Sequence, residues 1–544
     1  MPRSAGDRRT RAGEGGGRVS ASLLLLNGRI LTFAGGVAES LAAAGDRVLA
    51  TGASRELAAL CGPRTQVVDL GGRLALPGFT DCHVHLRALG HKLSQVDLSS
   101  VSSLPSALRR VAARARRTPP GEWITGSGFD KNRWGEALPD RRHLDRAAPG
   151  HPVALSSRDG HSVWVNSLAL TRCGIARDTE ALPGGVIPRD AAGEPTGILQ
   201  ERALDLIYGC PGFEEKASGD EVLAGLRALL RRGITSVHGM EEKGTFADLQ
   251  ALREAGRMPI RVTLYRHLSE LDGMLAAGMR SGLGDEWLRI GGVKMLIDGS
   301  LGSQTAWLFS PYEASDSYHG VPVMHGTELR AVVRRAAEAG LACAIHAIGD
   351  RAAAEALDAL EQVREVQTPL PHRIEHAQLV RPHDIPRFAS LKIVASMQPC
   401  HIPGDIDTAE RHWGARSRWA YPVRTLMRAG ATVVFGSDAP VETADPMVGV
   451  HAAVRRRTPD GRPPGGWYRA EEGIGRLAAL RAYTVAPALA TGEARLKGRL
   501  APGYLADIVV LSEDITRVQP SRLAAPRVDM VFVGGRLRFR RGVR

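Results

Sequence analysis

Short apolar runs alternate with amphipathic stretches along the middle of the chain. Eight of these runs have the length of β-strands: Leu76–His85, Gly233–His238, Ile260–Tyr265, Gly292–Ile297, Ala342–Ala347, Arg373–His376, Ile393–Gln398 and Thr432–Gly436. Stretches between them, such as Glu328–Gly340 and Arg424–Gly430, are helix-like. Eight strand–helix units are what a TIM barrel needs, a fold that typically takes ~250 residues. The pattern therefore predicts an α/β fold, a TIM (β/α)8 barrel, within residues 76–490.

The gap between the first and second predicted strands is far too long for one helix. We therefore interpret residues from about 95 to about 220 as an insertion, which we expect above the catalytic face of the barrel.

Short strands are predicted at both ends of the chain. Leu23–Ile30 is an apolar run broken by an Asn-Gly turn signal. Similar short apolar runs recur near the other end, at Asp507–Leu511 and Val531–Leu537. We predict that residues 19–75 and 491–544 together form one small sheet domain. Residues 1–18 are rich in Gly and Arg and lack apolar periodicity, so they are predicted to be a disordered basic tail.

The formal net charge is +13, from 71 Lys and Arg against 58 Asp and Glu, which raises the question of a nucleic-acid partner. Much of the excess lies at the two ends, between Arg3 and Arg18 and between Arg536 and Arg544. Runs of arginine elsewhere lack interleaved aromatic residues. We interpret the positive charge as solvated surface and expect no nucleic-acid partner.

The six cysteines are scattered without a CxxC pair, which is typical of reduced thiols in the cytoplasm. No apolar stretch approaches the ~20 residues that span a membrane. Arg8-Arg9 is followed only by the short run Leu23–Leu26, whereas the apolar region of a signal peptide takes about 7–15 residues. We expect a cytoplasmic protein without a membrane partner, and the sequence leaves a homodimer open.

Histidines and an aspartate stand at the ends of several predicted strands. His83 and His85 share one face of the first strand because side chains alternate along a strand. His346, His376 and Asp438 stand at or just after the ends of three later strands. Each could alone be a hydrogen-bonded core residue or a helix cap. Because strand ends meet at one rim of a barrel, the set predicts a metal site there.

Lys294 shares one strand face with Asp298 in the segment Gly292–Ser300. A lysine inside a barrel is costly unless its charge is paired or removed. One interpretation is an ion pair with Asp298. The other is carbamylation by CO2, which would give an anionic ligand that bridges two metals.

The combination of these residues resembles the amidohydrolase superfamily. It rests on the segment Pro77–His85 together with Lys294, His346, His376 and Ser437-Asp438. Three further segments, Asp159–Asn166, Gly197–Glu201 and Asp298–Ser303, resemble the branch that contains N-substituted formamide deformylases (amidohydrolase family 3).

The resemblance implies a barrel joined to a β-sandwich made from both termini. It also implies one metal held by His83, His85 and Asp438, and a second held by His346 and His376. Carbamylated Lys294 would bridge them. We expect a divalent metal, one or two ions, with zinc the first expectation.

The predicted activity is hydrolysis of a non-peptide carbon–nitrogen bond in a small N-acyl or N-formyl amide. A metal-activated hydroxide would attack the carbonyl, and Asp438 would act as general base and then general acid. A lactonase, esterase or phosphoesterase could use the same site, and a non-catalytic scaffold is a further alternative.

Substrate contacts are predicted from the insertion and from the loops that follow the strands. The candidates are Trp134, His161, Asn166, Ser300 and His401, with Phe129 and Trp164 nearby in the sequence. The alternative for the aromatic residues is that they pack the insertion. His401 could equally be a loop histidine without a role.

Overall fold

A computed structural model describes residues 20–130, 134, 139–157, 161–210, 213, 219–458, 460–461 and 470–542, so the predicted disordered tail lies outside the described residues. The chain divides into two compact units. The first comprises Met1–Val84, Arg227–Met240 and Pro259–Arg544. The second comprises His85–Leu226 and Glu241–Met258.

Eight parallel strands follow one another in chain order around a barrel: β8 (Phe79–Val84), β15 (Ile234–Glu241), β16 (Arg261–His267), β17 (Leu288–Leu296), β18 (Ala342–Ala347), β19 (Arg373–His376), β20 (Val394–Met397) and β21 (Val433–Phe435). A parallel bridge between Val84 and Ala439 joins the first strand to the segment after the last. The predicted TIM barrel is confirmed.

The register of neighbouring strands aligns their carboxyl ends at one rim. Leu296 of β17 lies opposite His346 of β18, and Ala347 lies opposite His376 of β19. Side chains at these positions are therefore brought together from segments that are far apart in the sequence.

The prediction of a single first strand over Leu76–His85 was wrong, because this segment contains parts of two strands. Strand β7 (Leu74–Pro77) belongs to a different sheet from β8. The break falls at Gly78, where a Cβ atom would lie 2.1 Å from Oγ1 of Thr235. The chain passes from one sheet to the other at a point where no side chain fits.

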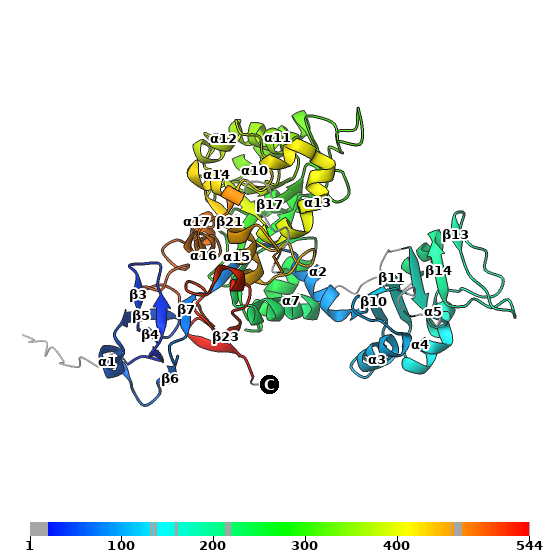
Figure 1. The fold of residues 1–544 in the computed structure, drawn as a ribbon, viewed down its shortest axis with the longest axis horizontal. Coiled ribbons are helices and arrows are strands. Elements are labelled where there is room, and N and C mark those ends of the chain that lie inside the picture. Colours follow the sequence, from blue (N-terminus) through cyan, green and yellow to red (C-terminus); the bar gives the residue numbers. More distant parts are fainter. Residues whose placement is uncertain are drawn as a thin grey trace, which may run out of the picture. The chain divides into compact units, whose positions relative to one another are not determined.

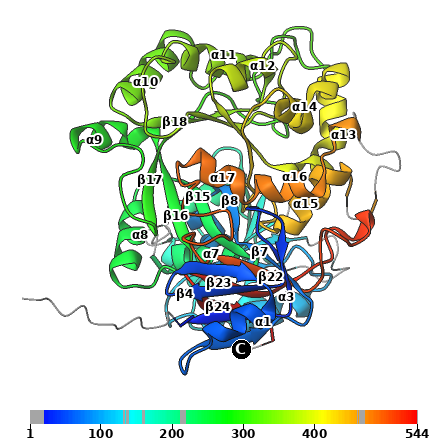
Figure 2. The ribbon, with the colours of Figure 1, turned by 90° about the vertical axis from the view of Figure 1, so that its left-hand side faces the viewer.

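Helices follow the later strands and form an arc around the barrel (Figure 2). In chain order they are α9 (Leu271–Ala276), α10 (Gly326–Glu338), α11 (Asp350–Glu361), α12 (Ile385–Ser390), α13 (Ile402–Trp413), α14 (Val423–Arg428), α15 (Pro446–Arg455), α16 (Arg476–Ala482) and α17 (Val485–Ala490). The amphipathic stretches predicted at Glu328–Gly340 and Arg424–Gly430 correspond to α10 and α14.

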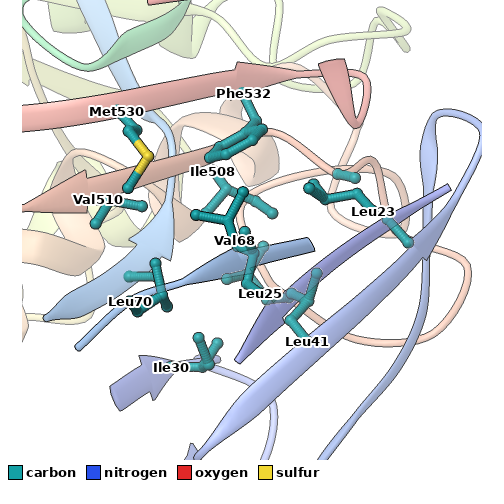
Figure 3. Packing of buried hydrophobic residues seen from close by; sticks show 14 of the residues in the cluster. Leu23, Leu25, Ile30, Leu41, Val68, Leu70, Ile508, Val510, Met530 and Phe532 are labelled. Carbon is teal, nitrogen blue, oxygen red and sulfur yellow. The ribbon is translucent and has the colours of Figure 1, made fainter. Parts of the chain in front are cut away.

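Two small sheets are built from the ends of the chain: the first from N-terminal strands alone, and the second from strands of both ends. One has the order β5-β4-β1-β6 and the other β24-β23-β22-β7-β2-β3. Their strands are β1 (Leu23–Leu26), β2 (Arg29–Leu31), β3 (Val37–Ala38), β4 (Ser40–Ala44), β5 (Arg47–Gly52), β6 (Gln66–Asp69), β22 (Ile508–Leu511), β23 (Val528–Val533) and β24 (Arg536–Arg540), with helix α1 (Ser54–Leu57) after β5. Leu25 and Leu41 share one buried core with Ile508 and Phe532, which come from the other end of the chain (Figure 3).

The second unit contains its own sheet, of order β13-β14-β12-β11-β10-β9 (Figure 1). The strands are β9 (Val96–Asp97), β10 (Ile124–Phe129), β11 (Val153–Ser157), β12 (Ser162–Val165), β13 (Gly185–Val186) and β14 (Ile198–Glu201). The helices of the segment are α2 (Leu86–Ser94), α3 (Leu104–Ala115), α4 (Arg141–Ala147), α5 (Ser167–Arg172) and α6 (Asp205–Tyr208). Helices α7 (Gly219–Arg231) and α8 (Thr245–Glu254) flank β15 in the sequence.

Among the residues that the structure describes, none of the helices is both long enough and apolar enough to cross a membrane.

Candidate functional site

Three side chains predicted as metal ligands meet at the rim of the barrel. They are His83 in β8, His376 at the end of β19 and Asp438 just after β21. Ligand atoms from these three buried residues lie within 4.8 Å of one another. The backbone N–H of Asp438 also donates to the carbonyl oxygen of His83 at 2.7 Å. The barrel thus gathers residues from its first, sixth and last strands.

Hydrogen bonds fix the tautomers of two of these imidazoles. The Nδ1–H of His83 donates to Oε2 of Glu375 at 2.6 Å, because an ionised carboxylate can only accept. The Nδ1–H of His376 donates to Oε1 of Gln398 at 2.9 Å. Each neutral ring therefore keeps its lone pair on Nε2, and Nε2 of His83 lies 3.5 Å from Oδ1 of Asp438. A lone pair on that nitrogen is what a metal requires.

His346 lies beside this group without being part of it. Its ring centroid is 4.5 Å from that of His376. The Nε2–H of His346 donates to the carbonyl oxygen of Gly299 at 2.9 Å, so its lone pair is on Nδ1. The structure therefore groups His376 with His83 and Asp438, whereas the resemblance assigned His376 to a second metal with His346.

The three histidines are held in the neutral form. Burial, reinforced by the charge of Lys294, lowers the pKa of His83 to about 4 and that of His346 to about 3. Burial and the neighbouring imidazoles place the pKa of His376 well below its ordinary value. Neutral imidazole is the form that binds a metal, so these side chains fit a cation site near neutral pH.

Lys294 is buried on β17 in the same surroundings. Burial lowers its pKa to about 8, although the charges of Glu375 and Asp438 act in the opposite direction. A pKa of about 8 leaves roughly a tenth of the amine neutral at pH 7, far more than for an ordinary lysine, and this is compatible with the predicted carbamylation, which itself stays a prediction.

Two buried carboxylates hold the backbone around the site. Asp81 accepts from the backbone N–H of His83 at 3.2 Å and from the N–H and Oγ–H of Ser437 at 2.9 and 2.5 Å. Asp298 accepts backbone N–H groups of Trp307, Ile348 and Gly349 at 2.8–3.0 Å. The first thereby ties β8 to the turn before Asp438, and the second ties together the loops after β17 and β18.

Sequence reasoning missed Glu375, Gln398 and Asp81. Burial raises the pKa of Glu375, but Arg373 and His83 outweigh burial and hold that pKa well below its usual range. The available signal was an Arg and a Glu two residues apart on an apolar strand, which places two charges on one face of a buried element.

His85 belongs to the second unit and is half-buried. It stands at the N-cap of α2 and interacts electrostatically with Glu241, whose pKa burial raises to about 7. The carboxylate of Glu241 accepts the backbone N–H of Leu86. The role of His85 as a metal ligand stays a prediction.

The three substrate candidates of the insertion differ in environment. Trp134 is buried against Phe129 and Trp164, with ring centroids 5.9 and 5.8 Å away. Asn166 is buried at the N-cap of α5, where Oδ1 accepts the backbone N–H of Ala169 at 3.0 Å. Trp134 thus packs in the insertion and Asn166 caps a helix, and their contact with a substrate stays a prediction. His161 is exposed and pairs with Glu201 at 3.1 Å.

Ser300 and His401 belong to the barrel unit. Ser300 follows the carbonyl group of Gly299 that accepts from His346, and its own backbone N–H donates to Thr305 at 2.9 Å. The Nε2–H of His401 donates to the carbonyl oxygen of Ser437 at 3.2 Å, next to Asp438. Ser300 lies on the loop after β17, His401 ends a short 3-10 turn before α13, and the contact of both with a substrate stays a prediction.

The amidohydrolase family matches residues 66–539, which is most of the chain. The chain belongs to this family. The resemblance inferred from the strand-end histidines, Lys294 and Asp438 is thereby confirmed, and the protein is a hydrolase by family membership.

Three relatives illustrate the breadth of similarity. The amidohydrolase is 34% identical over 539 residues to the protein LONG AFTER FAR-RED 3 of Arabidopsis thaliana, covering 95% of this chain and 91% of the relative. It is 29% identical to an N-substituted formamide deformylase of Arthrobacter pascens, and the match covers 95% of this chain and 98% of the relative. A solved structure of an uncharacterised metal-dependent hydrolase from Pyrococcus furiosus is 32% identical, with a TM-score of 0.73. The match covers 91% of this chain and 100% of the other.

Proposed function

We propose that this amidohydrolase is a metal-dependent enzyme that hydrolyses a non-peptide carbon–nitrogen bond in a small N-acyl or N-formyl amide. The observation that carries the proposal is the buried group of His83, His376 and Asp438 at the barrel rim. The similarity to an N-substituted formamide deformylase over nearly the whole of both chains supports the choice of bond. The scattered cysteines support a cytoplasmic location.

The donor set fits a divalent cation such as zinc. Imidazole nitrogen and carboxylate oxygen are ordinary zinc ligands, and the buried rings are neutral with lone pairs directed by Glu375 and Gln398. His83, His376 and Asp438 would hold one ion, and the neighbouring His346 and carbamylated Lys294 would serve a second. A bound divalent metal supplies a Lewis acid and lowers the pKa of the attacking water.

Asp438 carries the proton transfers of the proposed reaction. Its carboxylate would accept a proton from the attacking water and deliver it to the leaving nitrogen, which is general base followed by general acid catalysis. Because it lies at the rim beside His83, the same carboxylate can reach both a bound cation and a substrate above it. The Nε2–H of His401 donates to the carbonyl oxygen of Ser437, so His401 would have to release that hydrogen bond before it could donate one to the developing oxyanion.

The decisive experiment combines metal analysis with a substrate panel. Purified protein is expected to contain one or two equivalents of zinc, manganese or iron, and to turn over N-formyl amines or N-acyl amino acids. Lactones, p-nitrophenyl esters and phosphoesters complete the panel. Turnover confined to those esters or lactones would reject the carbon–nitrogen bond, and protein that takes up no metal and turns over nothing would indicate a scaffold.

A further inference from the structure

A fully buried arginine connects several strands inside the barrel. The guanidinium of Arg373 on β19 donates to the carbonyl oxygen of Cys82 on β8 at 2.7 Å and to Oγ of Ser396 on β20 at 2.7 Å. It also donates to Nδ1 of His238 on β15 at 2.9 Å. The ring of Tyr265 on β16 lies 4.9 Å from the guanidinium. One side chain thus contacts four other strands.

Glu375 lies two residues along the same strand and faces the same interior. Its two carboxylate oxygens accept from Arg373, and Oε2 also accepts the Nδ1–H of His83 at 2.6 Å. The side chains of Arg373 and Glu375 are 1% and 0% exposed. Arg373, Glu375 and His83 therefore form a continuous series that ends at the candidate metal group.

Burial of this ion pair is expensive. Transfer of two charges out of water often costs more than their mutual attraction returns, and an apolar pair of similar volume would fill the space at least as well. The hydrogen bond to His83 leads from Glu375 out of the pair toward the site, where the charge of Glu375 also acts on Lys294. The cost therefore points to a role beyond filling the barrel.

We propose that Arg373 and Glu375 are positioning residues for the metal centre. Glu375 fixes the ring of His83 with Nε2 directed toward His376 and Asp438, and Arg373 holds the carboxylate where it accepts the Nδ1–H. The inference rests on the proposed metal-dependent function, and the experiments below separate its failure from the failure of that function. Groups that orient a metal-bound histidine typically contribute 10–100-fold to metal affinity.

The first test measures zinc affinity of the metal-free protein by competition with a chromophoric chelator, without reference to activity. Glu375→Gln keeps the size and an acceptor oxygen but loses the charge, and we expect zinc to bind about 10–100-fold more weakly. The matched control is Asp507→Asn, which breaks another buried pair: Asp507 accepts from Arg261 at 2.7 and 3.1 Å. The control is expected to retain wild-type zinc affinity.

A double variant separates positioning from support of the fold. Arg373→Met with Glu375→Leu removes both charges together, which a barrel interior tolerates better than the loss of one partner. We expect this variant to fold and still to bind zinc at least about 10-fold more weakly. A folded double variant, or a folded Glu375→Gln protein, with wild-type zinc affinity would overturn the positioning role.

The second test observes His83 directly. Nitrogen-15 spectra of histidine-labelled, metal-free protein are expected to show His83 with its proton on Nδ1, and a mixture of tautomers in the double variant. If the wild-type protein binds no zinc, the proposed function fails. The spectra still show whether Arg373 and Glu375 fix the tautomer of His83. A wild-type His83 protonated on Nε2, or distributed between both nitrogens, would overturn the inference.

Discussion

Two of the three grouped side chains extend from an unusual backbone conformation. His376 and Asp438 have φ values of 70° and 58°, in the left-handed region that L-residues rarely adopt. Such positions cost on the order of 1–3 kcal/mol each and persist only where the surroundings hold them. The N–H of Asp438 donates to the carbonyl group of His83, and the hydroxyl and N–H of Ser437 bind Asp81. The backbone therefore presents the carboxylate of Asp438 toward the histidines.

Replacement of Asp438 by asparagine is expected to remove most turnover while the protein retains metal. Asparagine tolerates the left-handed conformation, but it cannot take a proton from water. We expect kcat to fall by about 10²–10⁴-fold, the usual contribution of a general acid–base group. Steady-state kinetics with metal analysis check this, and the exposed Asp358→Asn is the control. Undiminished turnover would refute the proton-transfer role.

Carbamylation of Lys294 is expected to rise with pH. The amine that reacts with CO2 is the neutral one, and burial brings the pKa of Lys294 down to about 8 from 10.5. The neutral fraction therefore increases as the pH passes from 7 to 9. Carbon-13 spectra with labelled bicarbonate should show a carbamate signal that grows over this interval and disappears in Lys294→Met. No such signal at any pH would contradict the prediction.

The site residues at strand ends could be predicted from the sequence, because the apolar runs locate the strands and the polar side chains stand where these runs end. The partners of those residues could not be predicted. Glu375 is 292 positions from His83, and Ser437 is 356 positions from Asp81, so their pairing depends on barrel closure. The packing of Trp134 and the capping by Asn166 likewise depend on neighbours that the sequence pattern does not show, and the contact of these two residues with a substrate stays a prediction.

At the scale of elements, α15 and α16 pack through a glycine. A Cβ atom at Gly449 in α15 would lie 2.0 Å from the hydroxyl oxygen of Tyr483, at the C-cap of α16, and 3.0 Å from Cζ of the same ring. Tyr483 is itself buried against Phe79 and Phe435, with ring centroids 6.2 and 5.4 Å away. The ring therefore has little room to retreat.

Gly449→Ala is expected to destabilise the protein by about 1–3 kcal/mol, because overpacking forces the helices apart. Chemical unfolding followed by circular dichroism measures the change. Tyr483→Phe in the Gly449→Ala background should recover part of the loss, since it removes the nearest atom. Gly273→Ala in α9 is the control: apart from its chain neighbours and its own helix backbone, none of the described residues lies within 4 Å of the added Cβ atom. Equal losses at both glycines would contradict the packing argument.

The eight barrel strands were predictable because a strand buried on both faces is a nearly continuous apolar run. The division between β7 and β8 was not. Leu74–Pro77 and Phe79–Val84 are both fully buried, and apolar residues stand on both sides of Gly78, so burial does not mark the division. Only the different hydrogen-bonding partners, β22 for β7 and β15 for β8, separate the two strands.

At the scale of the molecule, a buried ion pair connects the barrel to the small sheets. Arg261 of β16 donates to both carboxylate oxygens of Asp507, which immediately precedes β22. Oδ1 of Asp507 also accepts the backbone N–H of Gly534 at 2.8 Å. The second sheet is thereby tied to a barrel strand whose paired residue is 246 positions away in the sequence.

Asp507→Asn is expected to lower the free energy of unfolding by about 3 kcal/mol, because it removes the hydrogen-bonded counter-charge of the buried guanidinium of Arg261 and leaves only the carboxylate of Glu286, 3.9 Å away. The measurement is the same chemical unfolding. Exposed pairs provide the control: Arg335 and Asp272 are 54% and 85% exposed, so Asp272→Asn should change stability by less than about 0.5 kcal/mol. A comparable effect of the two substitutions would contradict the structural role of the buried pair.

The sequence predicted that both ends of the chain belong to one small domain, since their short strands have a common style. The details that depend on long-range polar contacts were not predictable. Lys497, placed near the sheet domain by its position in the sequence, is instead buried with Glu493 at 2.8 Å and donates to Ser236 of β15 at 2.9 Å. Lys497 thus neutralises a buried carboxylate and donates a hydrogen bond to a barrel strand, and no local sequence pattern indicates either contact.

The closure of the barrel has a consequence for how the protein withstands heat and proteases. Strands β8 and β21 are joined at the rim by the Val84–Ala439 bridge and by the hydrogen bond from Asp438 to His83. A cation bound by both His83 and Asp438 would add a further link at this closure and so hold the first and last barrel strands together. Ligand affinity would then be converted into resistance to unfolding, growing with the logarithm of free metal concentration.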